Sequence, residues 1–291
     1  MTGKVHASVP NPSAGIGSLT KAFEPVSFVT GASGYVGRAL MPELRRVEAR
    51  VQGRCVAHVR PDSPQLDTCR SAFEAIGAGL NTSPWNLKAL RASLQELRPS
   101  HVFHLVGTTK ARASAEATAA PYRSVDQGLF ELLLECLQDL ESAPRVIYLS
   151  SRGASPRSLS AYLRTRHACE QLLISSGLPY TIARPGLITG PDRDPPRRGE
   201  RLAAAVLGPV AALVDALGLG GSAARLRPFD AAEIAYGLVH AGFNYTTIGR
   251  VLEADELRYS QTKDREWSGP PSRRDGPVSY THLTLPTTPY V

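Results

Sequence analysis

The chain of 291 residues is 42% hydrophobic and 20% charged, which fits one large α/β domain or two small ones and excludes a disordered or fibrous protein. Its formal charge of +7 would suit an anionic partner, yet 28 of the 33 basic residues are arginines scattered along the sequence. Because no arginine-rich block interleaved with aromatic residues occurs, we expect no nucleic-acid partner.

The first part of the chain predicts a parallel sheet. Residues 1–24 lack the apolar run of a secretory signal and are expected to form a flexible leader. Beyond them, apolar β-branched runs alternate with segments of helical period. Strands are predicted at 26–31, 54–60, 101–107, 145–151 and 180–186, with a short strand before the second helix, and helices at 35–49, 86–98, 122–140 and 160–177. This order predicts a doubly wound α/β domain over residues 25–258.

The region at 187–231 is expected to form the substrate pocket of this domain. Its apolar stretch at 201–220 is interrupted by Pro209 and Asp215, and it is too broken for the roughly twenty residues that a membrane-spanning helix needs. We interpret this stretch as helices that cover the pocket. An amphipathic contact with a membrane surface is the alternative interpretation.

The end of the chain predicts two more elements and a tail. A helix is expected at 227–242, where Asp230 and Glu233 have the spacing of a capping box, and a last strand at 249–255. The Pro-rich and charge-rich residues that follow predict a disordered tail at 259–291. Within this tail, residues 276–291 resemble the conceptual translation of a transposase-adapter sequence, so they are excluded from the fold.

The stretch FVTGASGYVGRAL predicts a phosphate-binding loop. Gly31, Gly34 and Gly37 follow a strand and open a helix. Glycines at this spacing allow a tight turn, close approach of the backbone to a pyrophosphate, and close packing of helix on strand. The anion would lie at the helix N-terminus, as in a Rossmann-type dinucleotide site.

Two arginines favour NADP(H) over NAD(H). Arg60 stands near the end of the second strand, where an acidic residue would accept hydrogen bonds from the ribose of NAD, and Arg38 follows the last glycine. Two guanidiniums suit a 2′-phosphate better than a diol. Two alternatives stay open: both arginines are solvated surface residues, or Asp62 serves the ribose of NAD.

The cysteines and histidines give no indication of a metal site. Cys55, Cys69, Cys136 and Cys169 form no C-x-x-C pair and no metal-ligand spacing with histidine, which favours a reduced, cytoplasmic protein. His104 lies in a predicted buried strand and His167 lies beside the helix face that carries Tyr162, so both are expected to be structural.

These motifs resemble the atypical or extended branch of the short-chain dehydrogenase/reductase superfamily. Besides the glycine spacing, the resemblance rests on LVGTT after the fourth strand, LSSRGA after the fifth, Tyr162 on the next helix, and RPG at 184–186. It spans about residues 26–256. Within the branch, the segments GTTKARASAEA, YRSVD, LSSRGAS and RPGLI resemble the Tat-interacting oxidoreductase-like subgroup of NADPH-binding proteins.

The resemblance implies a role for each matching position. It implies a phosphate loop of Gly31, Ser33, Gly34, Tyr35, Val36 and Gly37, with Arg38 and Arg60 near the adenosine phosphate and Asn86 beside the adenine. It implies a nicotinamide side lined by Leu105, Val106, Gly107 and Thr108, with Pro185 and Gly186 near the carboxamide. It implies that Ser151 and Tyr162 are the catalytic serine and tyrosine, with Arg166 in place of the usual lysine and Asp126 in place of an asparagine.

Arg166, in place of the usual lysine, changes the expected chemistry. Tyr162 and Arg166 are four residues apart and share one helix face. A free tyrosine has a pKa of about 10, so proton transfer near neutrality requires a fixed cation beside it. Arg166 supplies a cation and can hydrogen-bond ribose hydroxyls, but it cannot deprotonate and therefore cannot relay a proton. Ser150 competes with Ser151 for the serine role, because strand alternation directs only one of them into the cleft.

Two functions follow from these residues. The first is an NADP-dependent oxidoreductase that acts on a small, apolar carbonyl or alcohol, with Tyr162 transferring the proton and Ser151 positioning the oxygen. The alternative is a non-catalytic regulatory or assembly protein that binds NAD(P)H with a degraded active site. The sequence leaves the identity of the substrate and the oligomeric state open.

Overall fold

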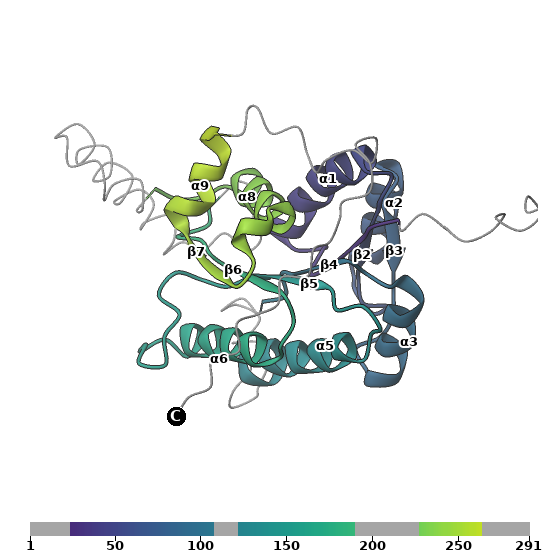
Figure 1. The fold of residues 1–291 in the computed structure, drawn as a ribbon. Coiled ribbons are helices and arrows are strands. Elements are labelled where there is room, and N and C mark those ends of the chain that lie inside the picture. Colours follow the sequence, from purple (N-terminus) through teal and green to yellow (C-terminus); the bar gives the residue numbers. More distant parts are fainter. Residues whose placement is uncertain (1–23, 108–121, 190–226, 264–291) are drawn as a thin grey trace, which may run out of the picture.

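A computed structural model describes residues 24–107, 122–189 and 227–263. In this part of the chain, seven parallel strands form one sheet in the order β3-β2-β1-β4-β5-β6-β7 (Figure 1). The strands are β1 (Val26–Thr30), β2 (Arg54–His58), β3 (Gly79–Asn81), β4 (His101–His104), β5 (Arg145–Leu149), β6 (Tyr180–Arg184) and β7 (Arg250–Glu253). The helices are α1 (Tyr35–Arg50), α2 (Leu66–Ala75), α3 (Leu87–Leu97), the π-helical turn η1 (Tyr122–Gln127), α5 (Gly128–Gln138), α6 (Ala161–Ser175), α8 (Ala231–Phe243), the 3₁₀ turn η2 (Tyr245–Thr247) and α9 (Ala254–Lys263).

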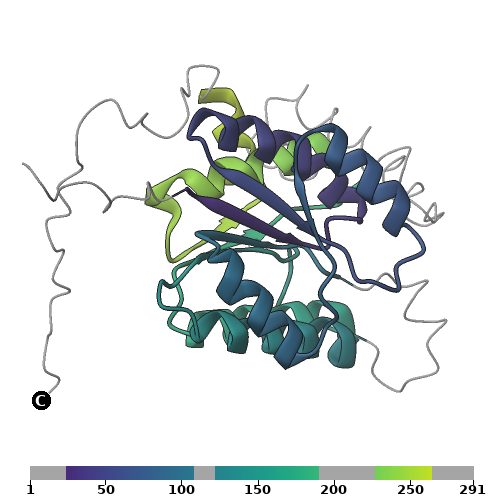
Figure 2. The same ribbon diagram turned by 90° about the vertical axis from the view of Figure 1, so that its right-hand side faces the viewer.

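The predicted doubly wound sheet is confirmed. Helices α1, α2, α8 and α9 cover one face of the sheet, and α3, α5 and α6 cover the other (Figures 1 and 2). Strand β1 pairs with β2 on one side and with β4 on the other, so the direction of the chain switches between β1 and β4. In open α/β sheets, ligands bind beyond the carboxyl ends of the strands at such a switch point.

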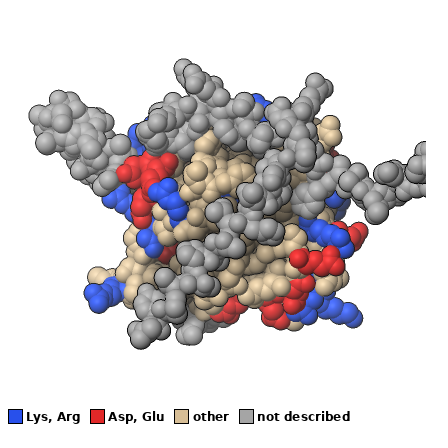
Figure 3. Space-filling view, viewed as in Figure 1, with Lys and Arg blue, Asp and Glu red and all other residues tan. Residues whose placement is uncertain are grey.

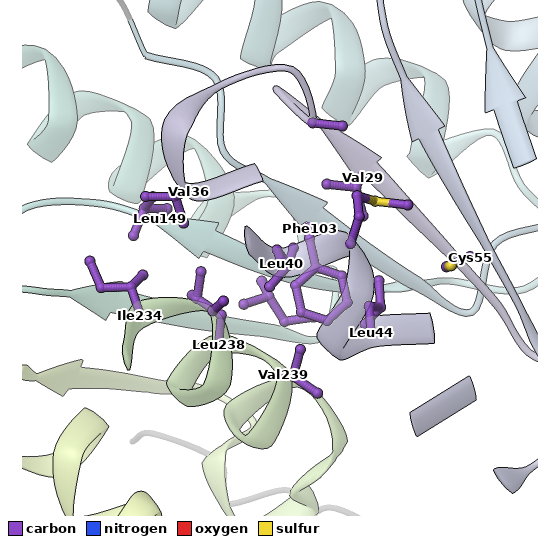
Figure 4. Packing of buried hydrophobic residues seen from close by; sticks show 14 of the residues in the cluster. Val29, Val36, Leu40, Leu44, Cys55, Phe103, Leu149, Ile234, Leu238 and Val239 are labelled. Atoms are coloured by element: carbon purple, nitrogen blue, oxygen red, sulfur yellow. The ribbon is translucent and has the colours of Figure 1, made fainter. Parts of the chain in front are cut away.

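Each face of the sheet has its own hydrophobic core. On the first face, Val36, Leu40 and Leu44 of α1 pack toward Ile234 and Leu238 of α8 (Figure 4). On the second face, the buried side chains come from α3, α5 and α6, among them Leu90, Leu94, Phe130, Leu133, Leu137 and Leu173. Burial on both faces explains why the strands are nearly continuous apolar runs rather than alternating ones.

Two helices were not predicted from the sequence. Helix α2 buries Cys69 and Phe73, whose spacing of four residues is helical. Helix α9 follows β7 and begins inside the range expected for the last strand. This helix is polar, and its anchors are the buried Leu257 and the half-buried Arg258, whose guanidinium lies 3.7 Å from the centroid of the Phe229 ring.

The predicted capping box at the start of α8 is confirmed. The backbone N–H of Glu233 donates to the Asp230 carboxylate at 2.7 Å, and the N–H of Asp230 donates to the Glu233 carboxylate at 3.2 Å. These two bonds satisfy backbone donors that a helix start otherwise leaves unpaired. The residues 1–23, 201–220, 276–291 and Thr108 lie outside the part that the structure describes. Within the described part, no helix is long and apolar enough to span a membrane.

Charged side chains of both signs lie next to one another on the surface. Figure 3 shows them around the rim of one face. Several arginines pair with carboxylates, for example Arg46 with Glu43 and Arg91 with Asp139, each at 2.6 Å. Among the described residues, the paired arginines therefore do not form a continuous basic surface.

Glu48 of α1 is a buried carboxyl group that makes stability depend on pH. Burial raises its pKa from 4.5 to about 7, although the Ser27 hydroxyl donates a hydrogen bond to it and opposes this shift. A raised pKa means that the folded protein binds the proton more tightly than the unfolded chain. Its contribution to stability is therefore complete below pH 4.5 and is lost as the pH rises through about 7.

We expect Glu48→Gln to raise the free energy of unfolding at pH 8 by about 3 kcal/mol, because the neutral amide has no proton to lose. The gain should shrink toward pH 5, where the wild-type carboxyl is protonated. Urea unfolding of both proteins at several pH values measures this, with Glu74→Gln on the exposed surface of α2 as the control. A gain that does not vary with pH would contradict the assignment.

Candidate functional site

The glycine loop between β1 and α1 has the geometry of a phosphate cradle. Gly31 has a φ of +76°, and a Cβ at this position would lie 2.8 Å from the carbonyl carbon of Leu105. A Cβ at Gly37 would overlap the carbonyl oxygen of Gly31 and would lie 2.6 Å from the Cα of Ala32. Glycine is thus required at both positions, because the loop touches the end of β4 on one side and α1 on the other.

The N-terminus of α1 is open to an anion. Gly34 is the N-cap residue and is exposed. It has no side chain that could pair with the first amides of the helix, and the first turn contains no acidic residue. The first amides of a helix carry unpaired N–H groups and the positive end of the helix dipole. Val36 anchors this turn in the core, and the Tyr35 hydroxyl donates to the carbonyl of Thr189 at 3.0 Å. The residues present therefore fit a pyrophosphate at this turn.

The residues predicted for the adenosine side are exposed and lie on α1 and in the segments after β2 and β3. Arg38 is exposed on α1 and donates to the carbonyl of Ser33 at 2.9 Å. Arg60 follows β2, and its guanidinium lies 3.6 Å from the carboxylate of Asp62. Asn86 accepts a hydrogen bond from the N–H of Ala89 at 2.9 Å, so its side chain is the N-cap of α3. Arg60 is the candidate for binding a ribose phosphate, and Asp62 is the candidate for binding a ribose diol. The two side chains thus face each other.

Sequence reasoning missed an aromatic pair beside these residues. His58 is the last residue of β2, and its ring meets the indole of Trp85 edge-on with a centroid distance of 4.9 Å. Its Nε2 lies 2.8 Å from the carbonyl oxygen of Ser83, and burial lowers its pKa. The position of His58 at the end of a strand at the carboxyl edge was the available signal.

The predicted nicotinamide side follows β4. Leu105 and Val106 come directly after the strand, and Leu105 approaches Gly31 of the phosphate loop. Gly107 is exposed, and a Cβ there would overlap the Nη2 atom of Arg166. Thus the loops after β1 and β4 and the arginine of α6 meet at one place.

Arg166 is buried and held by protein acceptors. Its Nη1 atom donates to the carbonyl of Val106 at 3.0 Å, the Tyr148 hydroxyl at 3.1 Å and the carbonyl of Leu149 at 3.4 Å. Its Nη2 atom lies 3.4 Å from the Asp126 carboxylate. Burial opposes its charge, yet its interactions with Tyr148, Tyr162 and Asp126 raise its pKa well above the ordinary value. The helix face shared by Tyr162 and Arg166 is confirmed, since the guanidinium lies 5.0 Å from the centroid of the Tyr162 ring.

The structure separates the two candidate serines. Ser150 is buried, and its hydroxyl donates to the Glu170 carboxylate at 2.5 Å. Glu170 also accepts from Arg184 at 2.8 and 2.5 Å, so Ser150 belongs to a buried network that ties α6 to β6. Ser151 is half-buried at the carboxyl edge. This arrangement supports Ser151 as the serine that faces a substrate.

A backbone hydrogen bond joins the loops that follow β5 and β6, next to Ser151. The N–H of Arg152 donates to the carbonyl of Pro185 at 2.9 Å. Pro185 is buried and Gly186 is half-buried directly after β6. Ser151 and the Pro-Gly pair thus lie on adjacent loops of the same sheet edge, next to the loop after β4.

The two histidines lie outside this chemistry, as their surroundings show. His104 is buried, bonds to the Thr30 hydroxyl through Nδ1 at 2.7 Å, and stacks on Phe130 with a centroid distance of 4.4 Å. Burial lowers its pKa to about 3, so it is neutral at physiological pH. His167 lies 3.8 Å from Glu170 within the buried network.

Comparison with known proteins agrees with this geometry. The model of the NAD dependent epimerase/dehydratase family matches residues 27–233. The chain belongs to this family. No curated protein is significantly similar to the family member described here.

Solved structures of similar fold include several UDP-sugar 4-epimerases. The UDP-glucuronic acid 4-epimerase of Bacillus cereus, solved with UDP-glucuronic acid and NAD, is 19% identical with a TM-score of 0.57, covering 78% of this chain and 76% of its own. The UDP-glucose 4-epimerase of Thermotoga maritima is 14% identical with a TM-score of 0.55, over 85% and 84%. That of Thermus thermophilus, in complex with NAD, is 19% identical with a TM-score of 0.51, over 80% and 81%. At these identities the likeness shows the fold of this family member; the predicted subgroup stays a prediction.

Proposed function

We propose that this family member is an NADP-dependent oxidoreductase of the short-chain dehydrogenase/reductase type, acting on a small, apolar carbonyl or alcohol. One observation carries the proposal: the glycine turn before α1 and Arg166 of α6 both contact the loop after β4, and Arg166 also lies against the Tyr162 ring. A dinucleotide held at the turn would extend along the carboxyl edge toward Tyr162.

The nicotinamide cofactor is supported by the family and by structures of similar fold solved with NAD. The preference for NADP rests on Arg38 and Arg60, the two exposed arginines predicted for the adenosine side. Asp62 beside Arg60 opposes this preference, because a carboxylate repels a 2′-phosphate.

The bound dinucleotide would supply a hydride at C4 of its nicotinamide. For reduction, the Tyr162 hydroxyl donates a proton to the carbonyl oxygen of the substrate, and the Ser151 hydroxyl donates a hydrogen bond to the same oxygen. The Arg166 guanidinium lies against the tyrosine ring, 5.0 Å from its centroid. A single reduction needs no proton relay through Arg166, so the arginine is compatible with turnover.

A titration of protein fluorescence with NADPH and NADH tests the cofactor. We expect tighter binding of NADPH. Arg60→Ala should weaken NADPH binding by about 10- to 100-fold, because a charge-assisted contact is lost, and should leave NADH binding nearly unchanged. Arg54→Ala is the matched control, since Arg54 is exposed at the opposite end of β2. Indifference of the wild type to both nucleotides would refute the proposal.

A second function is favoured by the burial of Arg166. Its guanidinium is held by Val106, Tyr148, Leu149 and Asp126, which is the environment of a structural arginine. A non-catalytic protein that binds NAD(P)H for regulation or assembly would have this arrangement. Tight NADPH binding without turnover of any carbonyl in a broad panel, and no gain from Arg166→Lys, would support this second function.

A further inference from the structure

Asp126 and Arg166 form an ion pair inside the protein. Their atoms Oδ2 and Nη2 are 3.4 Å apart, and the two side chains are 1% and 6% exposed. Removing one charge from a buried pair leaves the other charge without compensation in a medium of low polarity, which is strongly unfavourable. The carboxylate and the guanidinium therefore act as one neutral unit.

The backbone around Asp126 is built for this contact. Asp126 lies in the π-helical turn η1, which packs against α6 and leads into α5. Short π-helical turns are rare and are found frequently at functional sites. This turn brings a carboxylate from one helix onto the arginine of the next, and Arg166 in turn lies against the ring of Tyr162.

The other titratable groups around Arg166 are neutral or paired elsewhere. His104 of β4 is neutral, because burial lowers its pKa to about 3. Burial raises the pKa of Tyr148 in β5 and of Cys169 in α6, so both are protonated. Glu170 of α6 pairs with Arg184, and Glu131 of α5 is bonded to Gln127. Among the described residues, Asp126 is thus the carboxylate that balances Arg166.

We propose that Asp126 is a positioning residue for Tyr162: by pairing with Arg166, it limits how far this cation stabilises the tyrosinate form of Tyr162. The proposal rests on the function proposed above. A bare cation against the ring of a phenol stabilises the phenolate, whereas a neutral ion pair does so much less, since its two fields largely cancel.

Tyrosinate absorbance tests this without any turnover. The pH at which tyrosinate forms is measured in wild-type protein, and the signal that disappears in Tyr162→Phe is assigned to Tyr162. In Asp126→Asn we expect that signal to appear about 1 pH unit lower, because the charge of Arg166 is no longer balanced. In Asp126→Glu, which keeps the charge, the signal should appear at the same pH as in the wild type. Asp139→Asn, which removes a surface carboxylate paired with Arg91, should change nothing.

Two further variants keep the test decisive if Asp126→Asn does not fold. Arg166→Met should move the signal of Tyr162 to higher pH, and Asp126→Asn/Arg166→Met, neutral at both positions, should return it toward the wild-type value. An unchanged signal in the folded variants would overturn the role of Asp126. Failure of the wild type to bind NADPH would instead refute the proposed function, and the absorbance experiment would still decide the role of the pair.

Discussion

Tyr162→Phe is expected to lower the turnover number for carbonyl reduction by about 10²- to 10⁴-fold, the usual contribution of a general acid. The substitution removes the hydroxyl and leaves the ring, which lies 5.0 Å from the Arg166 guanidinium. The packing of α6 and the affinity for NADPH should therefore stay the same. Steady-state kinetics and the fluorescence titration measure the two quantities on one preparation.

Tyr245→Phe is the matched control for this loss. Tyr245 is 75% exposed and precedes β7 at the amino-terminal edge of the sheet, away from the phosphate loop. We expect the loss of the Tyr245 hydroxyl to leave turnover unchanged. If Tyr162→Phe retained full turnover, the proton would have to come from another group and Tyr162 would lose its role.

Gly37→Ala should have the second large effect, on both folding and cofactor binding. The added methyl group would overlap the carbonyl oxygen of Gly31, so α1 and the phosphate loop must separate. Overpacking of this kind costs about 1–3 kcal/mol of unfolding free energy, and the separated loop can no longer present its amides together. Urea unfolding and NADPH titration measure the two losses, and we expect the affinity to fall at least about tenfold.

Gly128→Ala provides the comparison at a helical glycine without neighbours. Gly128 begins α5, and a Cβ there would have nothing within 4 Å. Alanine is favoured over glycine in helices by about 1 kcal/mol, so this variant should be as stable as the wild type or more stable. Equal behaviour of the two variants would show that the contact between Gly37 and the loop has no consequence for binding.

The fold could be predicted largely from the sequence because buried parallel strands have a simple signature. Runs such as VSFVT and RVIYL are apolar on both sides, and this composition already requires helices on both faces. Helix α2 escaped prediction because its solvent-exposed residues outnumber Cys69 and Phe73 in the core. Helix α9 was not predicted because its anchor Arg258 contacts Phe229 and the carbonyl of Arg227, which are distant in sequence.

The parts of the candidate site whose residues lie on one helix or one loop could be predicted from the sequence. Tyr162 and Arg166 follow from helical spacing, and the phosphate loop follows from glycines between a strand and a helix. The environment of Arg166 could not be predicted, because its partner Asp126 comes from another helix and is directed inward by a π-helical turn. Likewise, the burial of Ser150 depends on Glu170 and Arg184, which only the folded chain brings together.

The packing of α1 against α8 has a consequence for synthesis of the protein on the ribosome. The two helices share one core although the chain makes α1 early and α8 late (Figures 1 and 4). Until α8 has left the exit tunnel, the apolar side of α1 lacks its cover and is a target for chaperones. The phosphate loop and α1 therefore gain their full packing support only after nearly all of the described residues have been translated.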